Sequence, residues 1–317
     1  MRKNGRRFEV VQMDVFASRP LEGNQLAVFT DARGLSDEEM QALAREMNLS
    51  ETTFILPRDA AVERERGVQV RIFTTQEELP FAGHPTLGTA FVLRNGNGAS
   101  EISLDLKVGK IPVRFTASDG KPVFGEMRQR DPEFGAVHNR EEVARVVGIE
   151  TKDLDENLPI QTVSTGVPFT ITPLLSLAVL RSLPFEAKRG EEYLRRTGGN
   201  LFYFVSRETA NPKARLQARM IFYNGEDPAT GSAAGCATAW LLAHGVIQPE
   251  EQALIEQGIE MKRPSQIFVR ASRPNKSETR AKTSERKSEN KSDQDNGVVN
   301  VRVGGNAVEV MRAEVII

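Results

Sequence analysis

The chain has 317 residues, of which 39% are hydrophobic and 27% charged, and its formal net charge at pH 7 is −1. At ~150 residues per domain this length predicts about two domains, and the balance of charge excludes a generally basic nucleic-acid coat and an acidic tail. The single cysteine, Cys236, excludes an intrachain disulfide and two-thiol chemistry, and the three widely separated histidines argue against a metal site.

The N-terminal segment predicts a strand over residues 9–16 and no secretory signal. It is basic, but Glu9, Gln12 and Asp14 interrupt the apolar stretch that a signal needs. The most apolar segment elsewhere, residues 167–180, contains two prolines and is shorter than the ~20 residues of a membrane-spanning helix. We therefore expect a cytoplasmic protein without membrane contact.

A capped helix and several strands form the predicted framework. Ser36 and Glu39 fit a capping box, and apolar residues from Met40 to Met47 follow at helical spacing. A second short helix is expected over residues 139–147, where an asparagine precedes a glutamate at capping distance. Runs of apolar and β-branched residues predict further strands at 67–73, 102–106, 111–116, 201–206 and 216–222.

The segment after the first helix carries a candidate acid/base residue. Glu51 lies between the end of that helix and the start of an apolar strand. A carboxylate held against apolar neighbours has a raised pKa, which suits proton transfer near neutral pH. An ordinary exposed loop glutamate is the simpler interpretation, and the residues alone favour it.

Two segments share a pattern in which a strand and a proline-containing turn lead to a glycine and then to a helix of small residues. The first helix begins around Gly83 and His84, with Pro85 suited to the first helical position, and the second begins at Gly231 and Ser232. Small side chains let other backbone pack closely, so each helix is expected at the centre of a sheet. The separation of the two segments, about half the chain, indicates a weak internal repeat.

The start of a helix offers unpaired backbone N–H groups and the positive end of the helix dipole, so it binds carboxylates. Two such starts that face each other would form a cleft for a small carboxylated substrate, with His84, Asp227 and Ser232 beside it. For each residue alone a structural role is simpler: Asp227 and Thr230 as helix caps, and His84 as the filler of a polar gap. Their combination favours a site.

Residues 272–297 are charged and almost free of apolar side chains, which predicts a flexible insert. Strand-like residues flank it on both sides, so we interpret it as an enlarged hairpin loop. A nucleic-acid tether is the least favoured alternative, because acidic residues are interspersed among its lysines and arginines. Beyond it, strands at 301–303 and 307–310 flank the Gly-Gly-Asn of residues 304–306, which predicts a hairpin turn.

Several unusual stretches match one family in the same order along the chain. They are 14–16 (DVF), 23–29 (GNQLAVF), 48–54 (NLSETTF), 71–74 (RIFT), 78–88 (ELPFAGHPTLG), 164–169 (STGVPF), 226–235 (EDPATGSAAG) and 263–265 (RPS). On these residues the chain resembles the PhzF-like, or phenazine biosynthesis-like, family of the diaminopimelate-epimerase-like fold.

The resemblance implies an α+β fold of two pseudo-symmetric lobes, each a mixed, mostly antiparallel sheet curled around a central helix, with the active site between them. It implies an N-terminal lobe over residues 1–125, to which residues 311–317 return, and a C-terminal lobe over residues 126–310 that carries the insert 272–297. It also implies a homodimeric isomerase of the epimerase, double-bond or keto-enol type, acting without a cofactor on a small carboxylated substrate.

By the same resemblance the catalytic residues are Glu51, His84 and Asp227, and the substrate-binding residues are Asn24, Gly83, Gly231 and Ser232. Glu51 would remove a proton from carbon and return it elsewhere or on the other face, while the other two assist proton transfer and orient the substrate. Proton removal beside a carboxylate-bearing carbon builds negative charge, which preorganised N–H donors stabilise. No metal is implied.

Two observations separate this chain from its relatives. Members of this fold that racemise amino acids use one cysteine per lobe, but here the corresponding positions are His84 and Ser232, and Cys236 lies one helical turn further on, where a buried hydrophobic role is simpler. The loop before Glu226 is shorter than the family pattern. Together with the insert, it leaves open a non-catalytic protein that binds small carboxylates on the same fold.

Overall fold

The computed structural model describes residues 5–96, 98–117, 122–222, 225–274 and 297–317. The predicted flexibility and the nucleic-acid alternative concern residues that lie mostly outside this range, at 275–296, and they stay predictions. On either side of that segment, β16 (Ser265–Ser272) and β17 (Val299–Gly305) pair antiparallel, so the hairpin interpretation of its flanks is confirmed.

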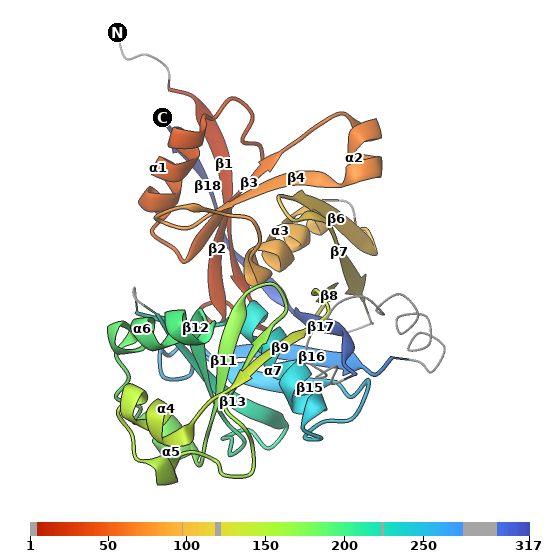
Figure 1. Ribbon diagram of the computed structural model, residues 1–317. Helices are drawn as coiled ribbons and strands as arrows, with labels where there is room; N and C mark the ends of the chain where they lie inside the picture. The colour runs from red at the N-terminus through yellow and green to blue at the C-terminus, as the bar shows by residue number, and fades with distance from the viewer. Residues whose placement is uncertain (1–4, 97, 118–121, 223–224, 275–296) are drawn as a thin grey trace, which may run out of the picture.

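The described strands pair side by side into one continuous, strongly curved sheet, and helices lie within and around its curves (Figure 1). The helices are α1 (Asp37–Met47), α2 (Ala60–Arg66), α3 (Gly83–Asn95), α4 (Arg140–Val147), α5 (Leu177–Arg181), α6 (Ala187–Thr197) and α7 (Gly231–Ala243). The other strands are β1 (Arg7–Val15), β2 (Asn24–Phe29), β3 (Glu51–Leu56), β4 (Val68–Phe73), β5 (Glu78–Leu79), β6 (Glu101–Leu106), β7 (Gly109–Thr116), β8 (Phe124–Arg128), β9 (Glu133–Val137), β10 (Gln161–Ser164), β11 (Pro168–Leu174), β12 (Leu201–Ser206), β13 (Ala214–Phe222), β14 (Gly225–Asp227), β15 (Ala253–Gln257) and β18 (Ala307–Ile316).

The two halves of the sheet repeat one pattern of strand pairing. From β1 through β2, β3, β4, β6 and β7 to β8, the neighbours pair antiparallel, parallel, antiparallel, parallel, antiparallel and antiparallel. The same succession runs from β10 through β11, β12, β13, β15 and β16 to β17. The short strands β5 and β14 pair with β4 and β13, each just before a long helix. The predicted fold class, two pseudo-symmetric α+β lobes, is therefore confirmed.

Each lobe wraps its sheet around one buried helix, α3 above and α7 below in Figure 1. The helix α7 contacts β10, β11, β16 and β17, and α3 contacts β1, β2 and β6. The sheet approaches closely where the helix residue is small: a Cβ at Gly88 would lie only 2.6 Å from the Leu26 side chain and 2.7 Å from that of Val15. The small residues that predicted central helices are thus explained by close packing.

One predicted connection is wrong. β17 pairs with β16 and with β8, the strand at the junction of the two halves, whereas β18 pairs along its length with β1 of the N-terminal half. Residues 304–306 therefore cross between the lobes instead of turning a hairpin (Figure 1). The glycines serve close approach: a Cβ would lie 2.5 Å from the Gly125 carbonyl oxygen at Gly304, and 2.7 Å from the Phe16 ring at Gly305. Glycine is favoured both in a tight turn and where two segments of backbone cross closely, so the glycines alone do not distinguish the two.

The two helix starts that were predicted from side-chain caps are confirmed, whereas three further helices were not predicted. Ser36 and Glu39 form both bonds of the capping box, and Asn139 caps α4. No helix was predicted at α2, α5 or α6, which are short or highly charged, although Ser176 caps α5. On α6 only Gly190, Tyr193 and Leu194 are buried. Such helices depend on packing more than on local pattern.

The lobes are joined through a shared strand. β8 pairs with β7 on one side and β17 on the other, and the predicted boundary after residue 125 falls within it. The division into residues 1–125 and 126–310 stays a prediction. Among the described residues, no helix is long and apolar enough to cross a membrane.

Candidate active site

Every predicted site residue stands at or near the end of an element that reaches the junction between the lobes. Asn24 begins β2, Glu51 begins β3, Gly83 and His84 begin α3, Asp227 ends β14, and Gly231 and Ser232 begin α7. The N-terminal lobe contributes three of these elements and the C-terminal lobe two, so the group assembles only when both lobes are folded.

The starts of the two central helices touch. A Cβ at Gly83 would lie 3.3 Å from the Ser232 backbone nitrogen and 3.4 Å from the Gly231 Cα. A Cβ at Gly231 would in turn lie 3.2 Å from the Phe16 ring. Glycine at both positions therefore lets two positive helix ends approach within van der Waals contact, which side chains would prevent.

Neither helix start is capped by a side chain. Ala82 and Thr230 occupy the cap positions, and neither makes a side-chain bond to the first turn. In α3 the first intrahelical backbone bond is from Thr86 to Ala82, and Pro85, the third helical residue instead of the predicted first, has no N–H. At the start of α3, the backbone N–H groups without an intrahelical partner are therefore those of Gly83 and His84. The first turn of α7 adds its own unpaired N–H groups.

Glu51 and His84 face each other across a short gap. Glu51 Oε2 and His84 Nε2 are 3.5 Å apart, longer than an ordinary hydrogen bond, and both atoms are buried without a hydrogen-bond partner. The Glu51 side chain is 16% exposed, so the exposed-loop interpretation is wrong. Burial, and secondarily the charge of Asp227, raises the pKa of Glu51 to about 8. The carboxyl group is therefore largely protonated at neutral pH.

The hydrogen bonds around His84 indicate which ring nitrogen carries its proton. Asn24 Nδ2 donates to Asp227 Oδ1 (2.7 Å) and to the Ala229 carbonyl (2.9 Å), which uses both amide hydrogens, although His84 Nδ1 lies only 3.2 Å away. The Gln25 backbone carbonyl accepts from the ring. Nδ1 is therefore the donor, and Nε2 is left as an acceptor that faces Glu51. Burial lowers the pKa of His84 to about 3, which keeps the ring neutral.

Asp227 is a buried carboxylate that receives hydrogen bonds on both oxygens. Asn24 donates to Oδ1 and the Thr230 hydroxyl to Oδ2. Burial raises the pKa of Asp227 to about 6, against the lowering effect of these two donors, and the charge of Glu226 raises it further. Thr230 occupies the cap position of α7, but Asp227 and Thr230 bond each other and not the first turn, so the prediction that their side chains cap the helix is wrong.

Two buried glutamines that sequence reasoning missed support the C-terminal helix start. Gln129 donates to the Gly231 carbonyl at 2.9 Å, and it lies so close to Gly235 that a Cβ there would be 1.8 Å from its Oε1. Gln257, the last residue of β15, donates to the Asp227 backbone carbonyl at 2.7 Å. A glycine within a helix, here Gly235, indicates that another group packs closely against it. Nothing in the sequence identified Gln129 as that group.

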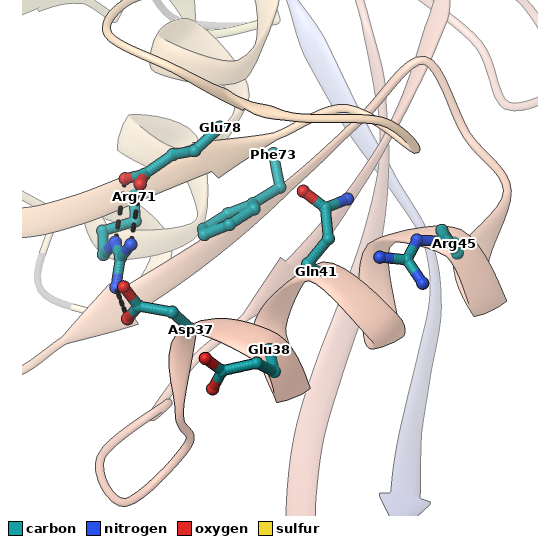
Figure 2. A pocket seen from close by; sticks show the side chains of 7 residues that line it. All are labelled: Asp37, Glu38, Gln41, Arg45, Arg71, Phe73 and Glu78. Carbon is teal, nitrogen blue, oxygen red and sulfur yellow. Dashed lines mark hydrogen bonds and ion pairs between the residues drawn. The ribbon is translucent and has the colours of Figure 1, made fainter.

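The hairpins that lead into the two helices are clamped by equivalent ion pairs, which the sequence reasoning also missed. Arg71 forks onto Glu78 with bonds of 2.8 and 2.6 Å, and Arg219 forks onto Glu226 with bonds of 2.9 and 2.7 Å. Figure 2 shows Arg71 bonded to both Glu78 and Asp37 in a pocket beside α1. That pocket is lined by Asp37, Glu38, Gln41, Arg45, Arg71, Phe73 and Glu78, none of which is a predicted site residue.

Within the described parts of the chain, no three His, Cys, Asp or Glu side chains are grouped as a metal site requires. Cys236 is buried in α7 beside the Thr165 hydroxyl, 3.4 Å away, and burial raises the pKa of its thiol to about 11. A thiol with this pKa stays protonated and is a poor nucleophile.

Comparison with known proteins places this geometry in a family. The family profile described as phenazine biosynthesis-like protein matches residues 13–313. The trans-2,3-dihydro-3-hydroxyanthranilate isomerase of Pseudomonas chlororaphis is 38% identical over 265 residues, which cover 82% of this chain and 89% of the relative. A PhzF-family phenazine biosynthesis protein from Bacillus anthracis aligns with a TM-score of 0.82 at 26% identity, covering 98% of this chain and 100% of its own.

A more distant structure shares the fold alone. The hydroxyproline epimerase of Agrobacterium vitis aligns with a TM-score of 0.62 at 11% identity and covers 98% of this chain and 93% of its own. Matches to the family profile and to the P. chlororaphis enzyme each span most of the chain. The chain therefore belongs to the phenazine biosynthesis-like (PhzF) family, and it is an isomerase.

Proposed function

We propose that the protein isomerises a small carboxylated metabolite by moving one proton between positions on its carbon skeleton, without a cofactor. The observation that carries this proposal is the Glu51–His84 pair, whose facing atoms are buried, unpartnered and 3.5 Å apart beside two uncapped helix starts. Such a pair has no evident structural role, since buried polar groups are ordinarily satisfied within the fold.

The helix starts supply the binding site for the substrate carboxylate. The donors are the backbone N–H groups of Gly83, Gly231 and Ser232 with the Ser232 hydroxyl, and the support for this assignment is that the first residues of α3 and α7 touch. They bind a carboxylate without a basic side chain, because both helix dipoles end there. The same donors stabilise negative charge that develops when a proton leaves an adjacent carbon.

Glu51 moves the proton. A pKa of about 8 leaves a minority of the carboxyl groups ionised at neutral pH and about half of them at slightly alkaline pH, so Glu51 serves as acid or base at little cost. As carboxylate it takes a proton from one carbon, and as carboxylic acid it returns that proton to another. Between these steps His84 Nε2 accepts a hydrogen bond from the protonated Glu51 carboxyl group, and Asn24 donates to Asp227 and holds it in place.

Proton NMR in D2O tests the proposal. Trans-2,3-dihydro-3-hydroxyanthranilate is the first substrate, because relatives at 35–38% identity carry its name, followed by other small enoic, hydroxy and amino acids. We expect deuterium to enter one carbon position of a turned-over substrate, and Glu51→Gln to slow this by about 10³-fold or more. Glu46→Gln, at an exposed position of α1, is the matched control and should act as the unsubstituted enzyme.

Two outcomes would reject the proposal. Equal exchange in the Glu51→Gln variant would remove Glu51 from the chemistry. Saturable carboxylate binding that survives in Glu51→Gln, with no turnover of any tested acid by the unsubstituted protein, would favour the alternative of a non-catalytic binding protein on this fold.

Assembly and location are proposed on the family resemblance alone. We propose a cytoplasmic homodimer, and sedimentation velocity at micromolar concentration measures the assembly directly. A single monomeric species would reject the dimer without affecting the proposed chemistry, since all the site residues named above come from one chain.

A further inference from the structure

Behind Asp227 lies a chain of buried polar side chains for which the proposed chemistry has no use. Tyr203 of β12 and Gln257 of β15 are fully buried, and Thr230, just before α7, is 8% exposed. They come from three separate elements of the C-terminal lobe and end at the Asp227 carboxylate. Burying polar groups of this kind destabilises the fold unless each one is hydrogen-bonded, so the partner of each group must be accounted for.

The Gln257 amide uses its whole hydrogen-bonding capacity. Nε2 donates to the Asp227 backbone carbonyl (2.7 Å) and to Thr230 Oγ1 (2.9 Å). Oε1 accepts from the Thr230 backbone N–H (3.2 Å) and from the Tyr203 hydroxyl (3.0 Å). A side-chain amide has two donor hydrogens and two acceptor lone pairs. All four are engaged, so the orientation of the amide is unique.

The direction of each hydrogen bond follows from that orientation. Because Gln257 donates to Thr230 Oγ1, the Thr230 hydroxyl hydrogen is free to go only to Asp227 Oδ2. Tyr203 in turn must donate, since Oε1 of an amide can only accept. The side-chain donors thus follow one direction, from Tyr203 to Gln257, from Gln257 to Thr230 and from Thr230 to the Asp227 carboxylate.

We propose that Tyr203, Gln257 and Thr230 are positioning residues that hold Asp227 ionised and aligned beside Glu51. The inference deepens the proposed function, since it assigns how the charge of that site is maintained. Donors that point at a carboxylate favour its ionised form and oppose the effect of burial. The titratable groups that face Asp227 act otherwise: Glu226 repels its charge, whereas Glu51, protonated in the range where Asp227 titrates, and His84 are neutral.

The test is a direct titration of Asp227 that needs no substrate. Protein labelled with ¹³C at the aspartate carboxyl carbon is titrated by NMR, and the signal missing from Asp227→Asn identifies the group. In Thr230→Val we expect the titration midpoint of Asp227 to rise by ~1 pH unit or more, because a charge-assisted donor is lost. In Tyr203→Phe we expect a rise of ~0.3 pH unit, because the chain is weakened at its far end.

Tyr193→Phe is the matched control. The Tyr193 hydroxyl is also buried and hydrogen-bonded, to His138 Nδ1 at 2.7 Å, but it belongs to a separate core cluster with no link to Asp227. It should cost similar stability and leave the midpoint unchanged. Thr230→Ser keeps the hydroxyl and should restore the normal midpoint.

The results separate this inference from the proposed function. An unmoved or lowered midpoint in Thr230→Val, or equal shifts in Tyr203→Phe and Tyr193→Phe, would overturn it. Should Thr230→Val not fold, the comparison of the two tyrosine variants decides. Shifted midpoints in a protein that turns over no substrate would uphold the positioning chain and reject the isomerase chemistry, whereas turnover with unmoved midpoints would do the reverse.

Discussion

Each lobe leads into its central helix through the same hairpin. An arginine in one strand forks onto a glutamate seven residues later, and a glycine that begins the helix follows after five more, as Arg71, Glu78, Gly83 and as Arg219, Glu226, Gly231. The two sets stand at a constant offset of 148 residues, which also relates His84 to Ser232. The scaffold around the two helix starts is therefore duplicated, while the side chains placed on it are not.

The difference lies in what each lobe places beside its helix start. The N-terminal lobe contributes Glu51 and the neutral His84, whose facing atoms have no fixed partner. The C-terminal lobe contributes Asp227, which is hydrogen-bonded on both oxygens and backed by Gln257. One side is left free to change its protonation and the other is held still, so a symmetric fold presents two unlike faces to a substrate.

The equivalent residues His84 and Ser232 should differ most. His84→Asn removes the acceptor that faces Glu51, and we expect turnover to fall by about 10³-fold. Ser232→Ala keeps the backbone N–H and loses only a hydroxyl, so about a tenfold loss is expected. Steady-state kinetics on the substrate found in the exchange screen measures both. Equal losses would contradict the division of roles between the lobes.

The two buried carboxyl groups should affect stability in different pH windows. The pKa of Glu51 is raised from 4.5 to about 8, so its ionisation destabilises the fold increasingly as pH rises through that range. Glu51→Gln should therefore match the unsubstituted protein at pH 4 and exceed its stability by about 2–5 kcal/mol at pH 9.

Asp227→Asn is the comparison for the other lobe. The pKa of Asp227 is raised from 3.8 to about 6, so any gain from the substitution must already be complete near pH 7. The gain in stability from Asp227→Asn should be smaller than that from Glu51→Gln, because Asn24 and Thr230 lose the carboxylate to which both donate. Urea unfolding from pH 4 to pH 9 measures both variants, and a Glu51→Gln gain that is independent of pH would contradict the raised pKa.

The two hairpin clamps should contribute unequally to stability. Arg219 also donates to the Leu180 carbonyl, and its side chain and that of Glu226 are 12% and 14% exposed. Arg219→Met leaves the partly buried Glu226 carboxylate without its partner and should lower the free energy of unfolding by about 2–4 kcal/mol. Arg71→Met leaves Glu78 with its second partner, Lys107, and should cost about 1 kcal/mol. Guanidinium chloride is unsuitable for this comparison because it screens ion pairs, so urea unfolding is the measurement.

The two glycines at the helix starts give the smallest expected difference. A methyl group at Gly83 meets backbone of the other helix at 3.3 Å, whereas one at Gly231 meets the edge of the Phe16 ring at 3.2 Å. The backbone of a helix can move aside less than the edge of a side-chain ring can. Gly83→Ala should therefore raise KM by about tenfold, and Gly231→Ala should raise it by less. A larger effect in Gly231→Ala would place the substrate carboxylate mainly on α7.

Local patterns predicted the parts of the molecule whose structure is decided by neighbours in the chain. The capping box at Ser36 and the cap at Asn139 are confirmed because a helix start is a contact between residues three positions apart. The helices after Gly83 and Gly231 were predictable because small residues report close packing wherever it occurs. The glycines at 304–305 show the limit of that signal, since a crossing between lobes and a turn select the same residue.

By itself the sequence determined the family, two related helix starts and the residues from which a site could be built. Only the tertiary structure decided their relations: that Glu51 faces His84, that Asn24 spans from His84 to Asp227, and that Gln257 supports Thr230. These pairs join segments that lie 27 to 203 residues apart. Burial and the resulting pKa shifts depend on all the surrounding elements together, and no local pattern encodes them.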